Sequence, residues 1–199
     1  MEIACVIDCR LAAPERPGRS GGLRPGREAL DDPVAAAEMT EAMVRTLEGI
    51  GAGVETERAG EIFFAVGGLR GLHGGEVAGV TAAARQAVGV PVLIGVGPTR
   101  TAARAAAERG ETVVTRERLG RFLAPLPTAV LVDRLGEPEA AAQLVASLER
   151  LGIATLGALR RLTHDQVADR FGPLGLRALR IARGEDEALR PRVPHADLV

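Results

Sequence analysis

Two acidic side chains, Asp8 and Glu61, stand beside segments that are predicted to be strands. Asp8 ends the apolar run 3–8, and Glu61 follows the Ala59-Gly60 turn of a predicted hairpin. If these strands lie side by side at the centre of one sheet, both carboxylates face a common site. Carboxylate oxygens close together suit Mg²⁺, which also binds phosphate oxygens. The pair is therefore a candidate Mg²⁺ site.

A second candidate site is the joint Leu151-Gly152-Ile153, an apolar-glycine-apolar turn between two predicted helices. This pattern is typical of a helix-hairpin-helix, whose backbone N–H groups and following helix N-terminus hold a nucleic-acid phosphate. We therefore predict DNA-backbone binding here. The alternative is an ordinary helical hairpin with a glycine at its turn and arginines on a solvated face. The candidate DNA-binding residues are Leu151, Gly152, Ile153, Thr155, Arg160 and Arg161.

The elements that position these residues form two predicted domains. Over 1–127 the order is strand, helix, strand, strand, helix, strand, helix, which predicts an α+β domain of ferredoxin-like, split βαβ topology with helices on one face of its sheet. Residues 128–195 are predicted as a small all-α helix-hairpin-helix domain, and 196–199 as a tail. The predicted strands are 3–8, 54–57, 62–66, 91–96 and 112–114, and the predicted helices of the first domain are 33–47, 75–88, 99–109 and 116–124.

The small domain carries specific helix signals. Apolar residues recur at helical spacing over 140–151, and Gly152 ends that helix. Thr155 is placed to cap a second helix, and Thr163 with Gln166 has the spacing of a capping box for a third. Gly172-Pro173 then interrupts the pattern before a fourth helix. These signals predict four short helices with tight turns over 140–183.

The composition limits the classes of function. The net charge is −1, which argues against nucleic-acid binding by bulk electrostatics. Every basic side chain other than histidine is arginine, a skew typical of a coding bias, so a single arginine is weak evidence of function. No apolar run approaches the length of a membrane span or a signal peptide, so we expect no membrane association and a cytoplasmic location. Cys5 and Cys9 are too few for a zinc site and are expected to be buried thiols.

The order and spacing of these segments resemble the Y-family DNA polymerases, closest to the degenerate ImuB-type branch, in which a palm is followed by a thumb. Members of this family copy past damaged template bases or assist that process. The resemblance covers most of residues 50–195. Its matches are Val6-Ile7-Asp8, Gly60 to Phe64, Gly67-Gly68-Leu69, Gly97 to Arg104, Leu151 to Gly157, Arg170-Phe171-Gly172, Gly184-Glu185-Asp186 and Leu189-Arg190-Pro191.

The departures from the family pattern carry the functional prediction. Active members hold two Mg²⁺ ions with two aspartates and often a neighbouring glutamate; here the resemblance puts Asp8 at the first aspartate, Gly60 at the second and Glu61 at the glutamate. Loss of one carboxylate empties or weakens a metal site that phosphoryl transfer needs. The resemblance also implies that Arg104 lies near an incoming triphosphate, with a solvated arginine as the alternative.

Two segments of the family are also missing from the pattern. The fingers are reduced to a short loop, of which Arg24-Pro25-Gly26 is a candidate remnant, and the sequence stops near the start of the little finger. We therefore expect an inactive polymerase homologue that acts in DNA repair or translesion synthesis through weak DNA-backbone binding and through other repair or replication proteins. The alternatives are a reduced but active Mg²⁺-dependent nucleotidyltransferase using Asp8 and Glu61, and a protein-interaction module.

Three further patterns favour structural roles. Gly95 and Gly97 precede a helix as in a dinucleotide-binding loop, but the third glycine of that motif is absent. Phe63 and Phe64 alternate across a strand, and core packing is expected for at least one of them. The three histidines are scattered along the chain, so we expect no three-histidine metal site.

Overall fold

The computed structural model describes residues 1–9, 32–110 and 113–193, which fall into two compact units. Unit 1 comprises Met1–Val113 and Ala188–Val199, and unit 2 comprises Val114–Glu187. The proposed fingers remnant Arg24-Pro25-Gly26 and the predicted tail at 196–199 lie outside the described residues. Among the described residues, no helix has the length and apolar character needed to cross a membrane.

Unit 1 is built on a four-stranded antiparallel sheet. Its strands are β1 (Ile3–Asp8), β2 (Val54–Arg58), β3 (Glu61–Ala65) and β4 (Val92–Gly97), in the spatial order β2-β3-β1-β4. Helix α2 (Pro33–Gly49) connects β1 to β2, and α3 (Val77–Val88) connects β3 to β4, after the short 3₁₀ helix η1 (Gly67–Leu72). This order and connectivity confirm the predicted ferredoxin-like, split βαβ topology.

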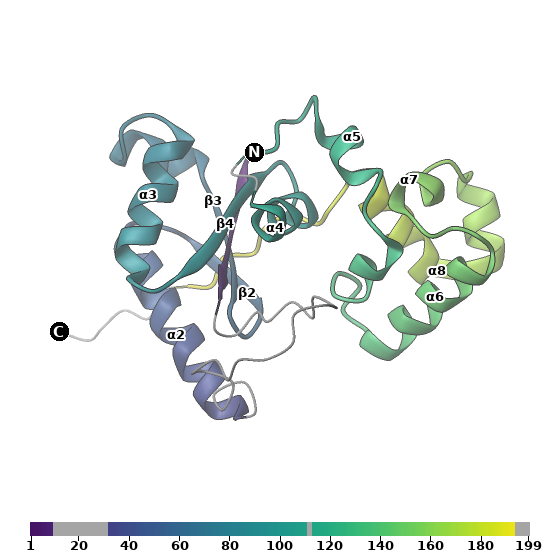
Figure 1. The fold of residues 1–199 in the computed structure, drawn as a ribbon, viewed down its shortest axis with the longest axis horizontal. Coiled ribbons are helices and arrows are strands. Elements are labelled where there is room, and N and C mark those ends of the chain that lie inside the picture. Colours follow the sequence, from purple (N-terminus) through teal and green to yellow (C-terminus); the bar gives the residue numbers. More distant parts are fainter. Residues whose placement is uncertain (10–31, 111–112, 194–199) are drawn as a thin grey trace, which may run out of the picture. The chain divides into compact units, whose positions relative to one another are not determined.

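Helices cover both faces of this sheet, so the prediction of helices on one face was wrong. Helices α2 and α3 pack against the face that carries Ala4 and Val6, whereas α4 (Arg100–Arg109) packs against the opposite face, through Ala103 and Ala107 (Figure 1). The sequence contained the signal: β1 is a continuous apolar run, buried at all six positions, rather than an alternating one. A strand without alternation is buried on both faces.

Glycine and alanine let α4 approach the sheet closely. A Cβ added to Gly95 would lie 2.2 Å from the backbone nitrogen of Ala107, and one added to Gly97 would lie 2.9 Å from the backbone nitrogen of Ala103. The two glycines of β4 are therefore required for packing between helix and strand. Their spacing serves this packing rather than a dinucleotide-binding loop.

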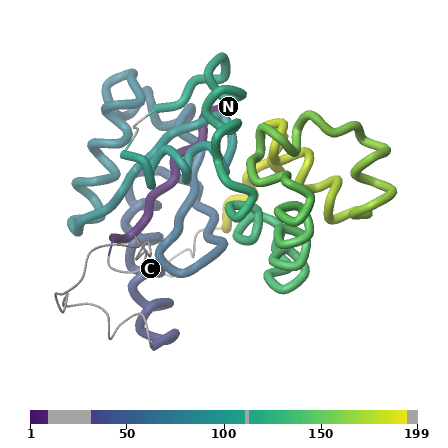
Figure 2. Tube along the Cα trace, turned by 45° about the vertical axis from the view of Figure 1, so that its right-hand side comes forward, coloured from purple at the N-terminus to yellow at the C-terminus, as the bar shows by residue number. Residues whose placement is uncertain are grey.

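Unit 2 is helical throughout its regular structure (Figure 2). It begins with the short helix α5 (Leu119–Leu123), shorter than the predicted 116–124, and the 3₁₀ helix η2 (Thr128–Leu131). Helices α6 (Pro138–Arg150), α7 (Leu156–Leu159) and α8 (His164–Ala182) follow. The unit begins at Val114, before the predicted boundary at 127/128, because α5 belongs with the helices that follow rather than with the sheet.

The predicted helix signals of unit 2 correspond to observed caps and breaks. Thr155 caps α7 through Ala158, and Thr163 and Gln166 form a complete capping box at the start of α8. Gly172, with φ 58° and ψ −154°, breaks α8 immediately before Pro173. Two helical segments thus meet at this kink, as the Gly-Pro pattern predicted.

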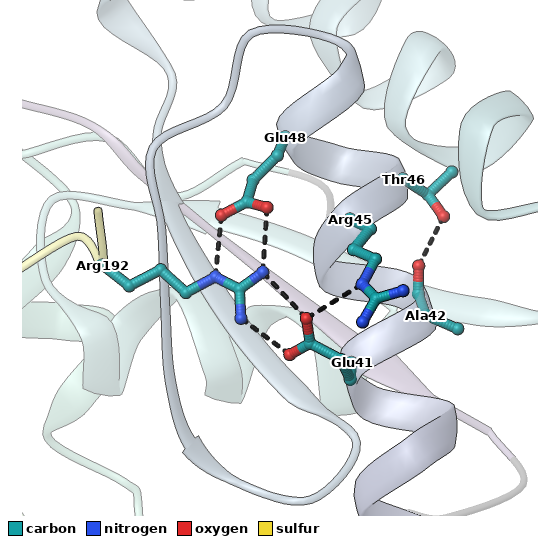
Figure 3. A network of polar contacts seen from close by, with 6 residues as sticks. All are labelled: Glu41, Ala42, Arg45, Thr46, Glu48 and Arg192. Carbon is teal, nitrogen blue, oxygen red and sulfur yellow. Dashed lines mark hydrogen bonds and ion pairs between the residues drawn. The ribbon is translucent and has the colours of Figure 1, made fainter. Parts of the chain in front are cut away.

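After unit 2, residues 188–193 return to unit 1 and form a strap along β2. The Arg192 amide donates to the carbonyl of Val54 over 2.8 Å, which covers part of the outer edge of the sheet. The Arg192 guanidinium lies between Glu41 and Glu48 of α2 and bonds both carboxylates, with shortest distances of 2.7 Å to each (Figure 3). These contacts lower the pKa of the Glu41 carboxyl and raise that of Arg192.

Candidate functional site

The backbones of the predicted acidic residues meet at one end of the central strands. The Asp8 amide donates to the carbonyl of Gly60 over 2.9 Å, and Ile7 pairs with Glu61 in the β1–β3 register. Asp8 and Glu61 are thus on neighbouring strands, close to the turn between β2 and β3. The sequence predicted that these two strands lie side by side, and this register confirms that part of the prediction.

The side chains of the two acidic residues project to different faces of the sheet. Glu61 pairs with Ile7 and therefore shares its face, the one covered by α4. Asp8 is the next residue along β1, so strand alternation directs its side chain to the face covered by α2 and α3; it is completely buried. The neighbouring backbones therefore do not bring the two carboxylates to one face.

Gly60 is a turn residue whose conformation is tied to helix α2. Its φ is +74°, in the left-handed region that glycine adopts without steric strain. Its amide donates to the Thr40 hydroxyl over 2.8 Å, and that hydroxyl donates to the carbonyl of Ala36 over 2.7 Å. Thr40 is buried and was missed in the sequence, where a threonine inside a helix gives no signal of a distant partner. The position is therefore specialised for a fixed hairpin turn.

The Glu61 carboxylate is held by two arginines. Its Oε2 atom lies 3.0 Å from Arg58 Nη2 and 3.2 Å from Arg104 Nη1, and its side chain is only 6% exposed. Arg104 also donates from Nε to Glu108, at 2.8 Å within α4. Arg104 was predicted as a contact for a nucleotide triphosphate, and in the structure its guanidinium contacts Glu61 instead of pointing away into solvent.

These residues do not fit the Mg²⁺ site that the resemblance implies. Magnesium requires several oxygen ligands converging in octahedral geometry. Gly60 offers no side-chain oxygen, Asp8 and Glu61 project to different faces, and Glu61 already contacts two cationic groups. Within residues 1–9, 32–110 and 113–193, no three His, Cys, Asp or Glu side chains come together as a metal-binding group.

The two cysteines of β1 and its C-terminal end have different environments. Cys5 is buried against α4, whereas Cys9 is exposed, so the expectation of two buried thiols was wrong for Cys9. Cys9 follows the last residue of β1, and its amide donates to the carbonyl of Pro91 over 3.2 Å. Partial desolvation and the neighbouring Asp8 charge raise the pKa of the Cys9 thiol, which keeps it protonated and weakens it as a nucleophile.

The joint of unit 2 is a helix C-terminus closed by Gly152. Gly152 has φ +77°; its amide donates to the carbonyl of Glu149, and the Ile153 amide donates to that of Leu148, both over 2.9 Å. This pair of bonds is the Schellman motif. The predicted left-handed glycine is confirmed, but its amide and that of Ile153 satisfy helix α6. They are therefore not the donors available to a phosphate.

The start of α7 is likewise occupied by internal acceptors. The Leu156 and Gly157 amides donate to the carbonyls of Leu126 and Ala124, each over 2.9 Å, and the Ala158 amide donates to the Thr155 hydroxyl over 3.2 Å. Gly157 is needed for this packing, because a Cβ there would lie 2.7 Å from the Ala124 oxygen. No described residue accepts a hydrogen bond from the amides of Ala154 and Thr155. These two amides are the donors that the joint leaves available.

The two arginines after the joint have different surroundings. Arg160 donates from Nη1 to the carbonyl of Gly120 over 3.2 Å, which holds it against α5. Arg161 is exposed, and its side chain makes no hydrogen bond or ion pair with the described residues. Leu151, at the same joint, is an exposed large apolar side chain. Of the two arginines, only Arg161 is available to an external anion without breaking a contact.

The chain is similar to bacterial DNA polymerases over part of their length. It is 30% identical over 161 residues to DNA polymerase IV 1 of Mesorhizobium japonicum, 28% over 130 residues to DNA polymerase IV of Caulobacter vibrioides, and 36% over 107 residues to that of Ralstonia nicotianae. These alignments cover 77%, 61% and 51% of the chain. The chain spans only 35%, 31% and 28% of these relatives. No protein-family model matches the chain.

Solved structures of Y-family polymerases share the fold. A Y-family polymerase chimera, Dbh-Dpo4(243-245)-Dbh, matches 98% of the chain with a TM-score of 0.65 at 14% identity, and 71% of that chimera is covered. DinB from Sulfolobus solfataricus matches 96% of the chain with a TM-score of 0.60 at 17% identity, and 70% of it is covered. A ternary complex of Dbh matches equally broadly, with a TM-score of 0.65 at 14% identity and 69% of it covered.

Proposed function

We propose that this chain, a homologue of the Y-family DNA polymerases over part of their length, is a DNA-binding protein of DNA repair or translesion synthesis that does not catalyse nucleotide transfer. The palm-like unit 1 acts as a scaffold in this proposal, and unit 2 binds the DNA backbone. A chain without catalytic activity would be similar in this respect to the degenerate, ImuB-type members of the family. Other repair or replication proteins would complete its action.

The observation that carries the proposal is the conformation of Gly60. The resemblance puts a metal-binding aspartate at this position, and the structure has a left-handed turn residue fastened to Thr40. Transfer of a nucleotide depends on cations that position and neutralise phosphates. In unit 1 a glycine stands where the family has its second metal-binding carboxylate, and Glu61 is paired to arginines. These residues do not supply the ligands that such cations need.

The proposed DNA contact uses the exposed side of the unit 2 joint. The amides of Ala154 and Thr155 and the guanidinium of Arg161 are available there without loss of an internal bond. Backbone amides and arginine are ordinary phosphate donors that read no base sequence. We therefore expect sequence-independent binding, and weak binding for a chain whose net charge is −1.

Two measurements test the proposal directly. Fluorescence anisotropy with a primer–template duplex at low salt should show saturable binding that weakens as salt rises. Primer extension with Mg²⁺ and all four nucleotides should give no product, with a DNA polymerase IV as positive control. A complete lack of binding contradicts the DNA-binding part, and extension of the primer by the unmodified chain contradicts the non-catalytic part.

A protein-interaction role is favoured by a different observation, the exposed Leu151 at the joint. An apolar side chain on a tight helical turn is suited to contact with another protein. A pull-down with candidate repair proteins that survives nuclease treatment and is lost in Leu151→Ser would support this role. Loss of the same pull-down on nuclease treatment would show that DNA bridges the partners.

A further inference from the structure

The ion pairs around Glu61 suggest what has replaced a metal centre in unit 1. Glu61 starts β3, immediately after the hairpin turn, and its carboxylate is almost completely buried. Arg58 comes from the end of β2, and Arg104 comes from α4, on the face of the sheet that Glu61 shares. The ion pairs of this carboxylate therefore connect β3 to β2, the neighbouring strand of the hairpin, and to α4, which is distant in the sequence.

The charges of this group favour arginine over a divalent cation. Glu61 and Glu108 each carry one negative charge, and Arg58 and Arg104 each carry one positive charge, so these four side chains together are neutral. A divalent cation bound to Glu61 would lie beside two guanidinium groups, whose nitrogens are 3.0 and 3.2 Å from the same carboxylate oxygen. Repulsion between like charges at such a distance is strong in a partly buried site.

We propose that Arg104, assisted by Arg58, is the permanent counter-ion of Glu61, and that this cluster is a structural lock between α4 and the β2–β3 hairpin rather than a divalent-cation site. The inference rests on the proposed function only in identifying Glu61 with the family's metal-binding glutamate. These ion pairs hold α4 against the β2–β3 hairpin, at the end of the sheet where the chain turns at Gly60. In this proposal Glu61 stabilises the fold.

The sign of a stability change distinguishes a lock from a metal site. In a group of carboxylates that awaits a cation, neutralising one relieves repulsion and stabilises the metal-free protein. In a compensated cluster, neutralising Glu61 removes a negative charge that lies beside two guanidinium groups and destabilises the protein. Urea unfolding of the full chain in EDTA should therefore show a lower midpoint for Glu61→Gln and for Arg104→Gln.

We expect the folding equilibrium constant to fall on the order of ten- to a hundredfold in each variant, since Arg104 is partly exposed. The double variant should lose less than the product of the two single losses, which shows that the two side chains interact. Arg45→Gln is the matched control. It removes an arginine whose side chain is 75% exposed and whose one ion pair with the described residues is to Glu41 on the same helix, so its effect should be small.

The same titrations with MgCl₂, and Mn²⁺ binding followed by electron paramagnetic resonance, complete the test. The midpoint of the unmodified chain should not rise with Mg²⁺, and no Mn²⁺ should bind at Glu61. The proposal is overturned if Glu61→Gln raises the midpoint in EDTA, or if the unmodified chain binds Mn²⁺ and Glu61→Gln abolishes that binding. No DNA is present in these measurements, so they are independent of the tests of DNA binding and primer extension. If Glu61→Gln does not fold, Arg104→Gln, which retains Glu61, provides the test of stability.

Discussion

The hairpin turn of unit 1 and the helical joint of unit 2 are each built on a glycine with almost the same conformation. Gly60 has φ +74° and Gly152 has φ +77°. Around Gly60, the turn amide and the Glu61 carboxylate are bonded to groups of the same unit, Thr40, Arg58 and Arg104. At the joint, the amides of Ala154 and Thr155 and the Arg161 side chain have no such partner among the described residues.

This difference separates polar groups that are bonded within the fold from polar groups that face solvent. Buried polar groups must be paired, and those of the unit 1 turn are paired within the unit. Solvent satisfies the exposed joint, which leaves its donors available to a phosphate. The comparison therefore predicts that substitutions at the unit 1 turn change stability and that substitutions at the joint change DNA binding.

The largest loss of stability is expected for Thr40→Val, which tests whether the hydrogen bond from the Gly60 amide to Thr40 stabilises the unit 1 turn. The substitution leaves the Gly60 amide without the Thr40 hydroxyl, and an unsatisfied buried donor costs about 1–3 kcal/mol. Urea unfolding should show this loss. Thr46→Val is the control on the same helix, because the Thr46 hydroxyl donates to the carbonyl of Ala42, four residues earlier, rather than to a distant turn (Figure 3). Equal losses in the two variants would contradict the internal role of Thr40.

A matched pair, Gly60→Ala and Gly152→Ala, compares the two glycines directly. Each substitution forces an alanine into the left-handed region, which costs about 1–2 kcal/mol. At Gly152 no atom lies within 4 Å of an added Cβ, so strain is the whole effect there. Both variants should unfold earlier in urea, but only Gly152→Ala should weaken DNA binding by anisotropy. This prediction is wrong if DNA binding weakens in Gly60→Ala and is unchanged in Gly152→Ala.

The pair Arg161→Gln and Arg160→Gln separates DNA contact from packing. Arg161→Gln removes a side chain available to phosphate and should weaken binding by about 1 kcal/mol, with the slope of log K against log salt reduced by about 0.9. Its urea midpoint should stay unchanged. Arg160→Gln removes the bond to the Gly120 carbonyl, so stability is the property that should change. Unchanged salt dependence in Arg161→Gln would exclude Arg161 as a phosphate contact.

The smallest effect is expected at the strap, where the Arg192 ion pairs are more exposed than that of Glu61. Exposed ion pairs contribute at most about 1 kcal/mol and are screened by salt. Arg192 lowers the pKa of Glu41, so this contribution is present above the ordinary carboxyl pKa of 4.5 and is lost as pH falls through the lowered value. Arg192→Gln should lower the urea midpoint slightly at pH 7, and the difference should vanish in acid. A difference that persists in acid would contradict the ionic origin.

Much of the fold was present in the sequence as local signals. The strand and helix order of unit 1 predicted the split βαβ topology, and Gly152, Thr155, Thr163 and the Gly172-Pro173 kink predicted the turns and caps of unit 2. Capping and left-handed glycine depend on groups within four residues of one another. Such groups are visible in a linear pattern because the chain brings them together by itself.

The partners of the candidate sites were decided by the tertiary structure. The sequence supplied Asp8, Gly60, Glu61 and Arg104, but only strand register shows that the carboxylates project to opposite faces and that α4 brings Arg104 to Glu61. The sequence likewise supplied the joint, but only packing against Leu126 and Ala124 decides that the Leu156 and Gly157 amides are taken. Bonds between distant segments follow from how helices and strands pack, and no local pattern encodes that packing.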